Sequence, residues 1–340
     1  MEATIAITGA TGFIGGTLIR QLASAGCQVQ ALIRPASMHK QPINGGVNWI
    51  RGDLADGDSL QRLVHGADTI VHCAGAVRGA SRQDFNRVNV DGVARLAQAA
   101  AKLKQPVRFL LMSSLAAREP QLSAYAASKQ QGERMLMETA GKLDWAVFRP
   151  TAVYGPGERE MMPVLRLMAR GVAPLIGSGN RRFSLLYAED LADAVMQWLE
   201  RGRDHKLTYE LHDGHPAGYS WQELVETVAR LRGGGVTPLK VPLVLVKLAA
   251  VMNLAAARAL GYAPMLTPGK VREISHPDWT ADNTALSQHT GWSPKIDLAE
   301  GLRRTLGLGD GRGQRTDDRG QRADDRLQAT EDKGQKTENR

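Results

Sequence analysis

The chain has 340 residues, 43% of them hydrophobic and 23% charged, with a net charge of +8 at pH 7. This composition is that of an ordinary globular protein, and the length allows one large α/β domain or one domain with a smaller lobe. Lys and Arg are scattered and not interleaved with aromatic residues, so no nucleic-acid interface is expected, and an anionic, phosphorylated cofactor explains the charge equally well.

Cys27 and Cys73 are the only cysteines. One pair offers neither a disulfide framework nor the spacing of a metal site, so we expect no bound metal and a reducing compartment. The first residues lack the basic segment of a signal peptide, and their apolar members already belong to a strand. We therefore predict a cytoplasmic protein.

The stretch from Thr4 to Gly15 (TIAITGATGFIG) predicts a buried strand that runs through a glycine loop into a helix. Backbone N–H groups at the start of a helix bind phosphate together with the helix dipole. In this spacing Gly9 would make a tight turn, Gly12 would let a pyrophosphate approach, and Gly15 would pack the helix on the strand. A glycine-rich turn without a ligand is the alternative.

A helix over Phe13–Ala25 and a strand over Val29–Ile33 complete the strand–helix–strand unit that a dinucleotide fingerprint requires. NAD sites usually place an Asp or Glu at the end of the second strand, where it binds the ribose. Arg34 stands there instead, with His39 and Lys40 nearby. A cation suits a 2′-phosphate, so the sequence favours NADP over NAD, unless Arg34 is simply a solvated loop residue.

Apolar runs then alternate with helical patterns as far as Pro150. The expected strands are Val47–Ile50, Thr69–His72, Val107–Met112 and Trp145–Phe148, and the expected helices are Asp58–Val64, Gln83–Lys104 and Ala124–Lys142. This alternation predicts an α/β fold with a doubly wound parallel sheet of the Rossmann type. Ligands of such sheets sit at the carboxyl ends of the strands, where Gly9, Arg34, Asp53, Ala74, Ser114 and Pro150 fall.

From Thr151 the elements become shorter, and Gly and Pro become frequent. Helices are expected at Met161–Arg170, at Glu189–Glu200 and from a capping box at Ser220 to Leu231, and strands at Ser184–Tyr187 and Leu207–Leu211. We therefore predict a dinucleotide-binding domain over 1–150, which holds the catalytic residues, and a smaller α/β substrate lobe over 151–308, interleaved with it. Residues 309–340 contain degenerate heptads without an apolar seam and are predicted to be a disordered tail.

The segment Val241–Leu260 has about the length of a membrane span. Pro242, Lys247, Asn253 and Arg258 interrupt it, and charges are costly at the centre of a span. We expect a buried or groove-lining helix. The alternative is a segment that docks on a membrane surface or lines a tunnel for an apolar substrate.

Tyr125 and Lys129 share one face of the helix that follows the fifth strand. A phenol has a pKa near 10, and a nearby ammonium is expected to lower it by stabilising the phenolate. Ser114, at the adjacent strand end, can donate a hydrogen bond to a substrate oxygen. The three residues together predict a proton-transfer site with Tyr125 as acid/base, Lys129 as the electrostatic aid and Ser114 as the positioning group.

In this order the motifs resemble those of the extended short-chain dehydrogenase/reductase superfamily, of the NAD-dependent epimerase/dehydratase type. The resemblance covers about Ile5 to Leu306. It rests on Thr8–Gly15, Gly52–Leu54, His72–Gly75, Asn89–Gly92, Ser113 and Ser114, Tyr125 with Lys129, Arg149–Pro156, Tyr187–Ala192 and Gly291–Pro294.

The resemblance implies a role for each matching residue. Ser114, Tyr125 and Lys129 would be the catalytic triad, and Lys129 would also bond the nicotinamide ribose. Asp53 and Leu54 would hold the adenine, and Ala74 and Gly75 would contact the adenosine side. Asn89 would support the cofactor site, and Pro150 and Val153 would border the nicotinamide. The loop that cradles the pyrophosphate would consist of Gly9, Thr11, Gly12, Phe13, Ile14 and Gly15.

One departure bears on the substrate. Ser114 is followed by Leu115–Pro120 (LAAREP) and not by the Tyr-Gly element and acidic pair of sugar dehydratases. Dehydration is therefore not expected, and among small-molecule substrates a less polar ketone or secondary alcohol is favoured over a nucleotide sugar. We predict hydride transfer between NADP(H), or NAD, and such a substrate. An epimerase that retains its cofactor and a non-catalytic dinucleotide-binding assembly protein remain alternatives, and the family suggests a homodimer.

Overall fold

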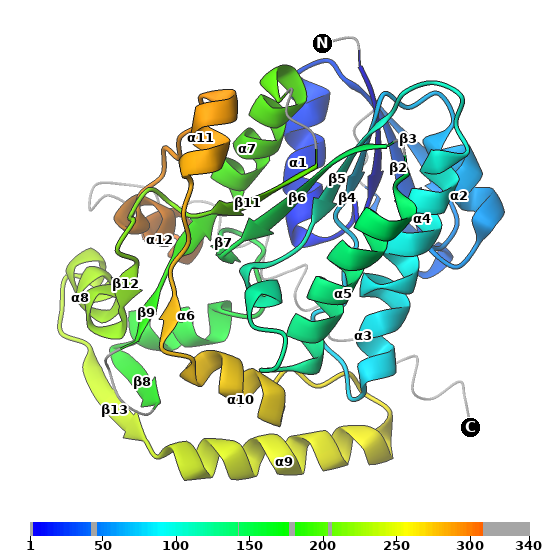
Figure 1. The fold of residues 1–340 in the computed structure, drawn as a ribbon. Helices are drawn as coiled ribbons and strands as arrows, with labels where there is room; N and C mark the ends of the chain where they lie inside the picture. Colours follow the sequence, from blue (N-terminus) through cyan, green and yellow to red (C-terminus); the bar gives the residue numbers. More distant parts are fainter. Residues whose placement is uncertain (1–2, 42–45, 142, 177–180, 203–205, 309–340) are drawn as a thin grey trace. The chain divides into compact units, whose positions relative to one another are not determined.

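The computed structural model describes residues 3–41, 46–141, 143–176, 181–202 and 206–308. Within these ranges the chain as far as Leu306 forms one compact unit (Figure 1). The predicted tail over 309–340 lies outside the described residues.

A seven-stranded sheet lies at the centre of this unit, and every neighbouring pair of its strands is parallel. The strand order reverses between β1 and β4, and a crevice at such a switch point is where doubly wound sheets bind ligands. Across the sheet the strands are β11 (Leu207–Leu211), β6 (Asp144–Pro150), β5 (Arg108–Met112), β4 (Thr69–His72), β1 (Thr4–Thr8), β2 (Gln28–Ile33) and β3 (Val47–Arg51). The predicted Rossmann-type fold is confirmed, and β11 joins the sheet from far beyond Pro150.

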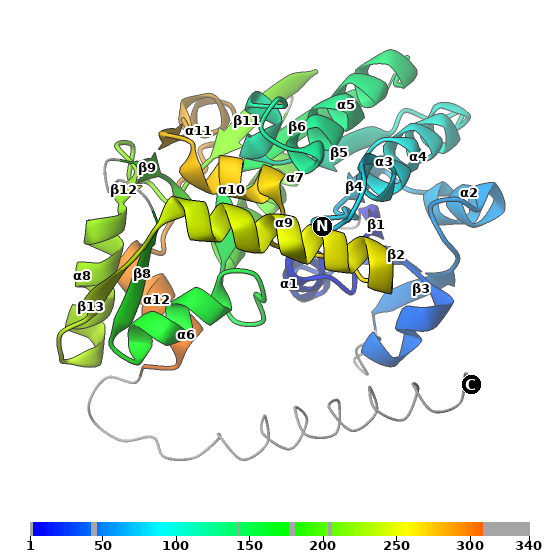
Figure 2. The ribbon, with the colours of Figure 1, turned by 90° about the horizontal axis from the view of Figure 1, so that it is seen from below.

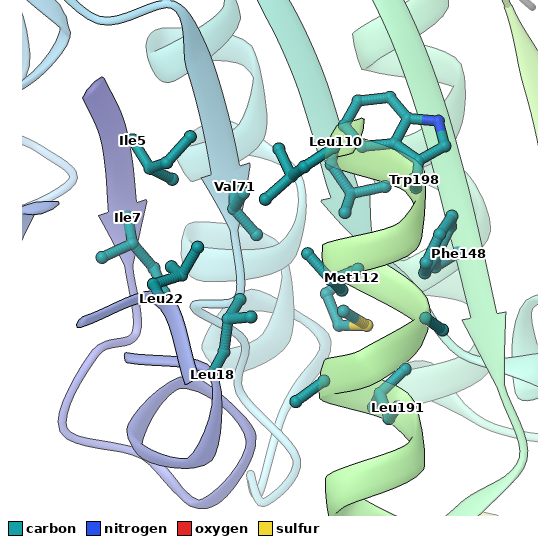
Figure 3. Packing of buried hydrophobic residues seen from close by; sticks show 14 of the residues in the cluster. Ile5, Ile7, Leu18, Leu22, Val71, Leu110, Met112, Phe148, Leu191 and Trp198 are labelled. Carbon is teal, nitrogen blue, oxygen red and sulfur yellow. The ribbon is translucent and has the colours of Figure 1, made fainter. Parts of the chain in front are cut away.

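Helices cover both faces of the sheet because successive strand residues point to opposite sides. Ile5 and Ile7 belong to the core on one face, with Leu18, Leu22 and Trp198 (Figure 3), whereas Ala6 belongs to the core on the other. The first face carries α1 (Phe13–Ser24), α7 (Ala188–Arg201) and α11 (Thr284–Thr290), and the second carries α2 (Gly57–Val64), α3 (Arg82–Asn89), α4 (Asp91–Ala101) and α5 (Ala124–Thr139).

The single helix predicted over Gln83–Lys104 is wrong, because the chain breaks at Val90 into α3 and α4. The side chain of Asn89, the last residue of α3, bonds Ala76 and Ser128. Its carbonyl oxygen lies so close to α5 that a Cβ on Gly132 would be 2.0 Å from it. The apolar periodicity continues through Val90 and therefore predicts one helix, but packing against α5 changes the direction of the chain there.

The region after Thr151 builds a smaller lobe with its own core. Its α8 begins at the predicted capping box, in which Ser220 and Glu223 bond reciprocally. The lobe has three small sheets, β7 (Ala152–Tyr154) with β10 (Leu185–Tyr187), β8 (Val172–Ile176) with β13 (Thr237–Val241), and β9 (Arg182–Phe183) with β12 (Tyr219–Ser220) and β14 (Asp278–Trp279). Its helices are α6 (Met162–Ala169), α8 (Trp221–Arg232), α9 (Leu243–Leu260), α10 (Pro268–Ser275) and α12 (Leu298–Leu306). Outside the lobe, short 3₁₀ turns follow β2 at Pro35–Lys40 and β5 at Leu115–Arg118.

The expectation that Val241–Leu260 is a buried helix is wrong. Val241 ends β13, and the rest of the segment from Leu243 forms α9, in which Ala250 and Ala257 are the only buried residues. It lies on the outside of the molecule, beyond α10 in Figure 1 and in front of it in Figure 2. Leu254 and Arg258 nevertheless line the large cavity described below, so the groove-lining part of the expectation holds for one side of the helix.

Candidate active site

The glycine loop connects β1 to α1, and at two of its glycines the neighbouring backbone is too close for any side chain. Gly9 has φ +72°, and a Cβ there would lie 2.5 Å from the backbone nitrogen of Ala74, at the end of β4. A Cβ on Gly15 would lie 2.2 Å from the carbonyl oxygen of Gly9. These two positions therefore fix α1 against the ends of β1 and β4, as the spacing predicted for a turn and a packing contact.

The amino end of α1 has no side-chain cap, because its N-cap residue is Gly12. No side chain among the described residues caps the first N–H groups of the helix, and with the helix dipole these groups favour an anion. The loop forms one wall of a cavity of about 1730 Å³ that extends to the substrate lobe. A dinucleotide fits this site for three reasons. The glycines leave the loop backbone open to a phosphate, the end of the helix is uncapped, and the cavity has room for a second molecule beside the dinucleotide.

Tyr125 lines the same cavity from the first turn of α5. Its ring packs edge-on against Phe85, with the ring centroids 6.1 Å apart. Burial raises the pKa of the Tyr125 hydroxyl to about 12, while its hydrogen bond with Ser114 acts in the opposite direction and Glu273 adds to the rise. The expected lowering of this pKa by an ammonium is therefore wrong for this structure, and the phenol keeps its proton at neutral pH.

Lys129 is 8% exposed and lies one turn further along α5. Its Nζ donates a hydrogen bond to the carbonyl oxygen of Met112, at 2.9 Å. Burial lowers the pKa of this ammonium to about 8, while Glu133 and Cys73 act in the opposite direction. The loop after β4 rests on Lys129, since a Cβ on Gly75 would lie 3.2 Å from Nζ.

The two serines after β5 have different partners. Ser114 is hydrogen-bonded to Tyr125, and its Oγ also accepts from the backbone nitrogen of Ala116 at 3.2 Å. Ser113 instead donates to the carboxylate of Glu133, which Arg149 also binds through two nitrogens at 2.6 and 3.0 Å. The geometry thus brings Ser114, and not Ser113, to Tyr125.

Helix α10 of the substrate lobe binds the beginning of α5 and fixes its position. Ser123 caps α5 at the nitrogen of Ala126 and donates to Glu273 of α10. Lys270 binds the same carboxylate at 2.9 Å, and Arg272 donates to the carbonyl oxygen of Leu122 at 2.7 Å. The position of Tyr125 therefore depends on a helix that the sequence analysis missed, although Thr267 followed by Pro268 is a helix-start signal.

The predicted site residues divide into two groups. Eleven of them line the cavity, namely Gly9, Thr11, Gly12, Phe13, Ile14, Gly15, Gly75, Ser114, Tyr125, Pro150 and Val153. The others, Arg34, Asp53, Leu54, Ala74, Asn89 and Lys129, are not among its lining residues. Arg34 is exposed at the end of β2, and buried Asn89 supports the loop after β4 through Ala76.

A second set of cavity residues was missed because its contacts join distant loops. Glu158 accepts from the backbone nitrogens of Met161 and Met162, at 2.8 and 3.0 Å, and so orders the turn before α6. Glu160 in that turn pairs with Arg78, from the loop after β4, at 2.8 Å. This pair ties the Rossmann sheet to the substrate lobe beside the cavity, and only its tertiary context reveals it.

Comparison with known proteins agrees with this geometry. The model of the NAD dependent epimerase/dehydratase family matches residues 5–211. The chain is 34% identical over 303 residues to a ceramide reductase of Caulobacter vibrioides, covering 89% of this chain and 93% of that protein.

The chain belongs to the NAD dependent epimerase/dehydratase family.

It is therefore an NAD(P)-dependent reductase or epimerase of the short-chain dehydrogenase/reductase type. A 2-alkyl-3-oxoalkanoate reductase of Stenotrophomonas maltophilia is 27% identical over 333 residues, covering 88% of this chain and 97% of that protein. Among solved structures, the NAD complex of UDP-glucuronic acid 4-epimerase from Bacillus cereus matches with a TM-score of 0.70 at 19% identity, covering 90% of this chain and 98% of the other. That likeness shows the shared fold.

The glycine contacts make a matched pair of substitutions informative. Gly15→Ala should weaken the binding of a reduced dinucleotide, NADH or NADPH, at least tenfold and lower the free energy of unfolding, because its Cβ has no room beside the Gly9 carbonyl oxygen. Gly16→Ala is the control, since the nearest atom to its Cβ would be 3.6 Å away. Titration of NADPH fluorescence and urea unfolding measure both effects. Equal behaviour of the two variants would contradict the assignment of Gly15 as the contact that fixes α1.

Proposed function

We propose that the protein is an NADP(H)-dependent reductase that interconverts a ketone and a secondary alcohol, with Tyr125 as the acid/base. The observation that carries this proposal is the Tyr125 hydroxyl, hydrogen-bonded to Ser114 on the wall of the cavity that the glycine loop also lines. A proton donor and a phosphate-binding loop thus face one cavity large enough for both a cofactor and a substrate.

A dinucleotide held at the glycine loop of Gly9, Gly12 and Gly15 would supply the hydride that reduces the carbonyl carbon, or would take one up from the alcohol in the reverse direction. Ser114 donates a hydrogen bond to the carbonyl oxygen and orients it. Tyr125 gives its hydroxyl proton to the same oxygen as negative charge develops there. Lys129 does not lower the pKa of the resting phenol, so the role we assign to its ammonium, one helical turn away, is to stabilise the negative charge that forms on the phenol oxygen as the proton leaves. A phenol with a pKa of about 12 holds the proton that reduction requires.

The preference for NADP rests on charge at the end of β2. Arg34 is exposed directly after this strand, where an NAD site usually carries a carboxylate, and Lys40 lines the cavity nearby. Cations at this place complement a 2′-phosphate.

A ketone with long apolar chains is the substrate class that we favour. The cavity as a whole exposes more apolar than polar surface, and on the lobe side the apolar residues Val153, Leu254, Met265 and Leu266 line it beside several charged side chains. The reductases named above act, by their names, on ceramide and on 2-alkyl-3-oxoalkanoate. The apolar part of the lining and the names of these relatives both support an apolar ketone.

An epimerase is the second candidate, because the matching family includes epimerases by its description. An epimerase would keep its dinucleotide bound and return the substrate at the same oxidation level. Dinucleotide that stays with the purified protein, with no net consumption of NADPH, would favour it.

Replacing the proposed acid tests the mechanism. Tyr125→Phe should retain NADPH binding but lower kcat for reduction by about 10²- to 10⁴-fold, because only the hydroxyl is removed. The rate is measured from NADPH absorbance with a panel of long-chain ketones. Tyr154→Phe is the matched control, since its buried hydroxyl has no hydrogen-bond partner among the described residues. Full activity of Tyr125→Phe would rule out the proposed role.

The cofactor preference is tested by reversing one charge. Arg34→Asp should shift the ratio of the Kd values for NADPH and NADH about tenfold to a hundredfold toward NADH, the worth of a hydrogen bond to a charged group. Arg95→Asp, an exposed change of the same charge on α4, should leave the ratio unchanged. Equal affinity of the unaltered protein for both cofactors would contradict the preference.

The pKa values predict a pH profile for reduction. The Lys129 ammonium loses its proton above about pH 8, whereas Tyr125 keeps its proton to about pH 12. The value of kcat/KM should therefore be level below pH 8 and fall as the pH rises from 8 to 10. Initial rates at constant ionic strength measure this profile. A level profile through pH 10 would show that the charge on Lys129 does not assist the reaction.

A further inference from the structure

Helix α9 has an inner and an outer face. The inner face packs toward the protein through Leu243, Val246, Ala250, Asn253 and Ala257, which recur at helical spacing and are buried or half-buried. The outer face is exposed and apolar, with exposed fractions of 73% for Val244 and 63% for Met252. Its other large members are Leu245, Leu248, Val251 and Leu260. A helix on a water-exposed surface normally carries polar residues on this side.

These side chains form a concentrated patch. Most of the exposed large hydrophobic residues in the described part of the chain fall between Leu239 and Tyr262. Single exposed apolar residues are ordinary, but a contiguous group marks an interaction surface. We call Val244, Leu245, Leu248, Val251, Met252 and Leu260 the α9 patch.

Basic residues border the patch. Lys247 and Arg258 lie about three helical turns apart and therefore project from the same margin of α9. No Asp or Glu occurs between Glu226 and Glu273, whereas this stretch contains Arg230, Arg232, Lys240, Lys247, Arg258, Lys270 and Arg272. An apolar helix face with cations along its edge matches the boundary between acyl chains and anionic headgroups.

The helix is held against the protein along its length. Ala250 and Ala257 are buried on its inner face, and Asn253 donates to the carbonyl oxygen of Leu266, at 2.8 Å. The Tyr262 hydroxyl bonds Asn253 in turn, at 2.6 Å. By length and composition α9 is apolar enough to cross a membrane, but crossing would break these contacts. The observed packing fits a helix that lies flat on a bilayer.

The helix that carries the patch also borders the active-site cavity. Leu254 and Arg258 of α9 line the cavity, as do Met265 and Leu266 that follow it. Arg258 also donates to the carbonyl oxygen of Ala80, in the loop after β4, at 3.4 Å. One side of α9 thus borders the cavity while the other side faces outward.

We propose that the α9 patch docks on the surface of an anionic lipid bilayer. The occupant is a lipid surface and not a second copy of this chain, because a self-complementary contact would bring two acid-free, basic stretches together. Docking holds the border of the cavity within about one helix diameter, about 10 Å, of the bilayer in which an apolar molecule dissolves. The docking itself does not depend on the reaction proposed above.

Vesicle flotation with the full chain tests the proposal. The protein should float with vesicles of phosphatidylcholine and phosphatidylglycerol, and less with vesicles of phosphatidylcholine alone. Leu248→Glu with Met252→Glu should reduce its partition at least tenfold, because two carboxylates enter the centre of the patch. Met137→Glu with Leu167→Glu is the matched control, since both side chains are exposed apolar residues outside α9 and their replacement should leave partition unchanged.

Circular dichroism and NADPH binding check that each variant is folded, so a loss of flotation is assigned to the surface. No flotation of the unaltered protein with either vesicle would overturn the proposal. So would a dimer in light scattering that the α9 pair converts to monomers, because a second copy would then cover the patch. NADPH binding and vesicle flotation are separate measurements, and failure of one leaves the other interpretable.

Discussion

The close contact between Gly9 and Gly15 is the constraint on which the site depends. It leaves no room for a side chain between the end of β1 and the start of α1, and the turn at Gly9 also lies against the end of β4. The amino end of α1 is therefore fixed beside the point where the strand order reverses. An anion-binding helix end and a crevice meet there because of one backbone contact.

The pKa values of the proposed acid/base and its neighbour are shifted by one physical cause. Burial disfavours charge on both groups, so it raises the pKa of Tyr125 to about 12 and lowers that of Lys129 to about 8. At neutral pH the phenol remains uncharged and the ammonium remains charged. Helix α5 presents both, and α10 fixes its first turn through the contacts of Glu273 and Arg272.

Local patterns were enough to predict the sheet, the glycine loop and the position of Tyr125 and Lys129 one turn apart on one helix, because strand alternation and helical spacing depend on neighbouring residues. The break at Val90 was not predictable, since contacts of Asn89 with α5 cause it while the apolar period continues. The contacts of α10 with the start of α5 were not predictable either, because they join residues about 150 positions apart in the sequence. The exposure of the apolar face of α9 likewise depends on tertiary structure, because the composition of this helix suits a buried helix equally well. The catalytic and cofactor roles of individual residues stay predictions.

A crystal structure of the protein with NADPH bound tests the central claim most directly, namely that one cavity joins the phosphate-binding end of α1 to the proton donor on α5. The account predicts the pyrophosphate on the first N–H groups of α1 and the nicotinamide ring between Tyr125 and the Pro150–Val153 segment. A pyrophosphate bound away from the glycine loop, or a nicotinamide out of reach of a molecule hydrogen-bonded to Tyr125, would contradict it.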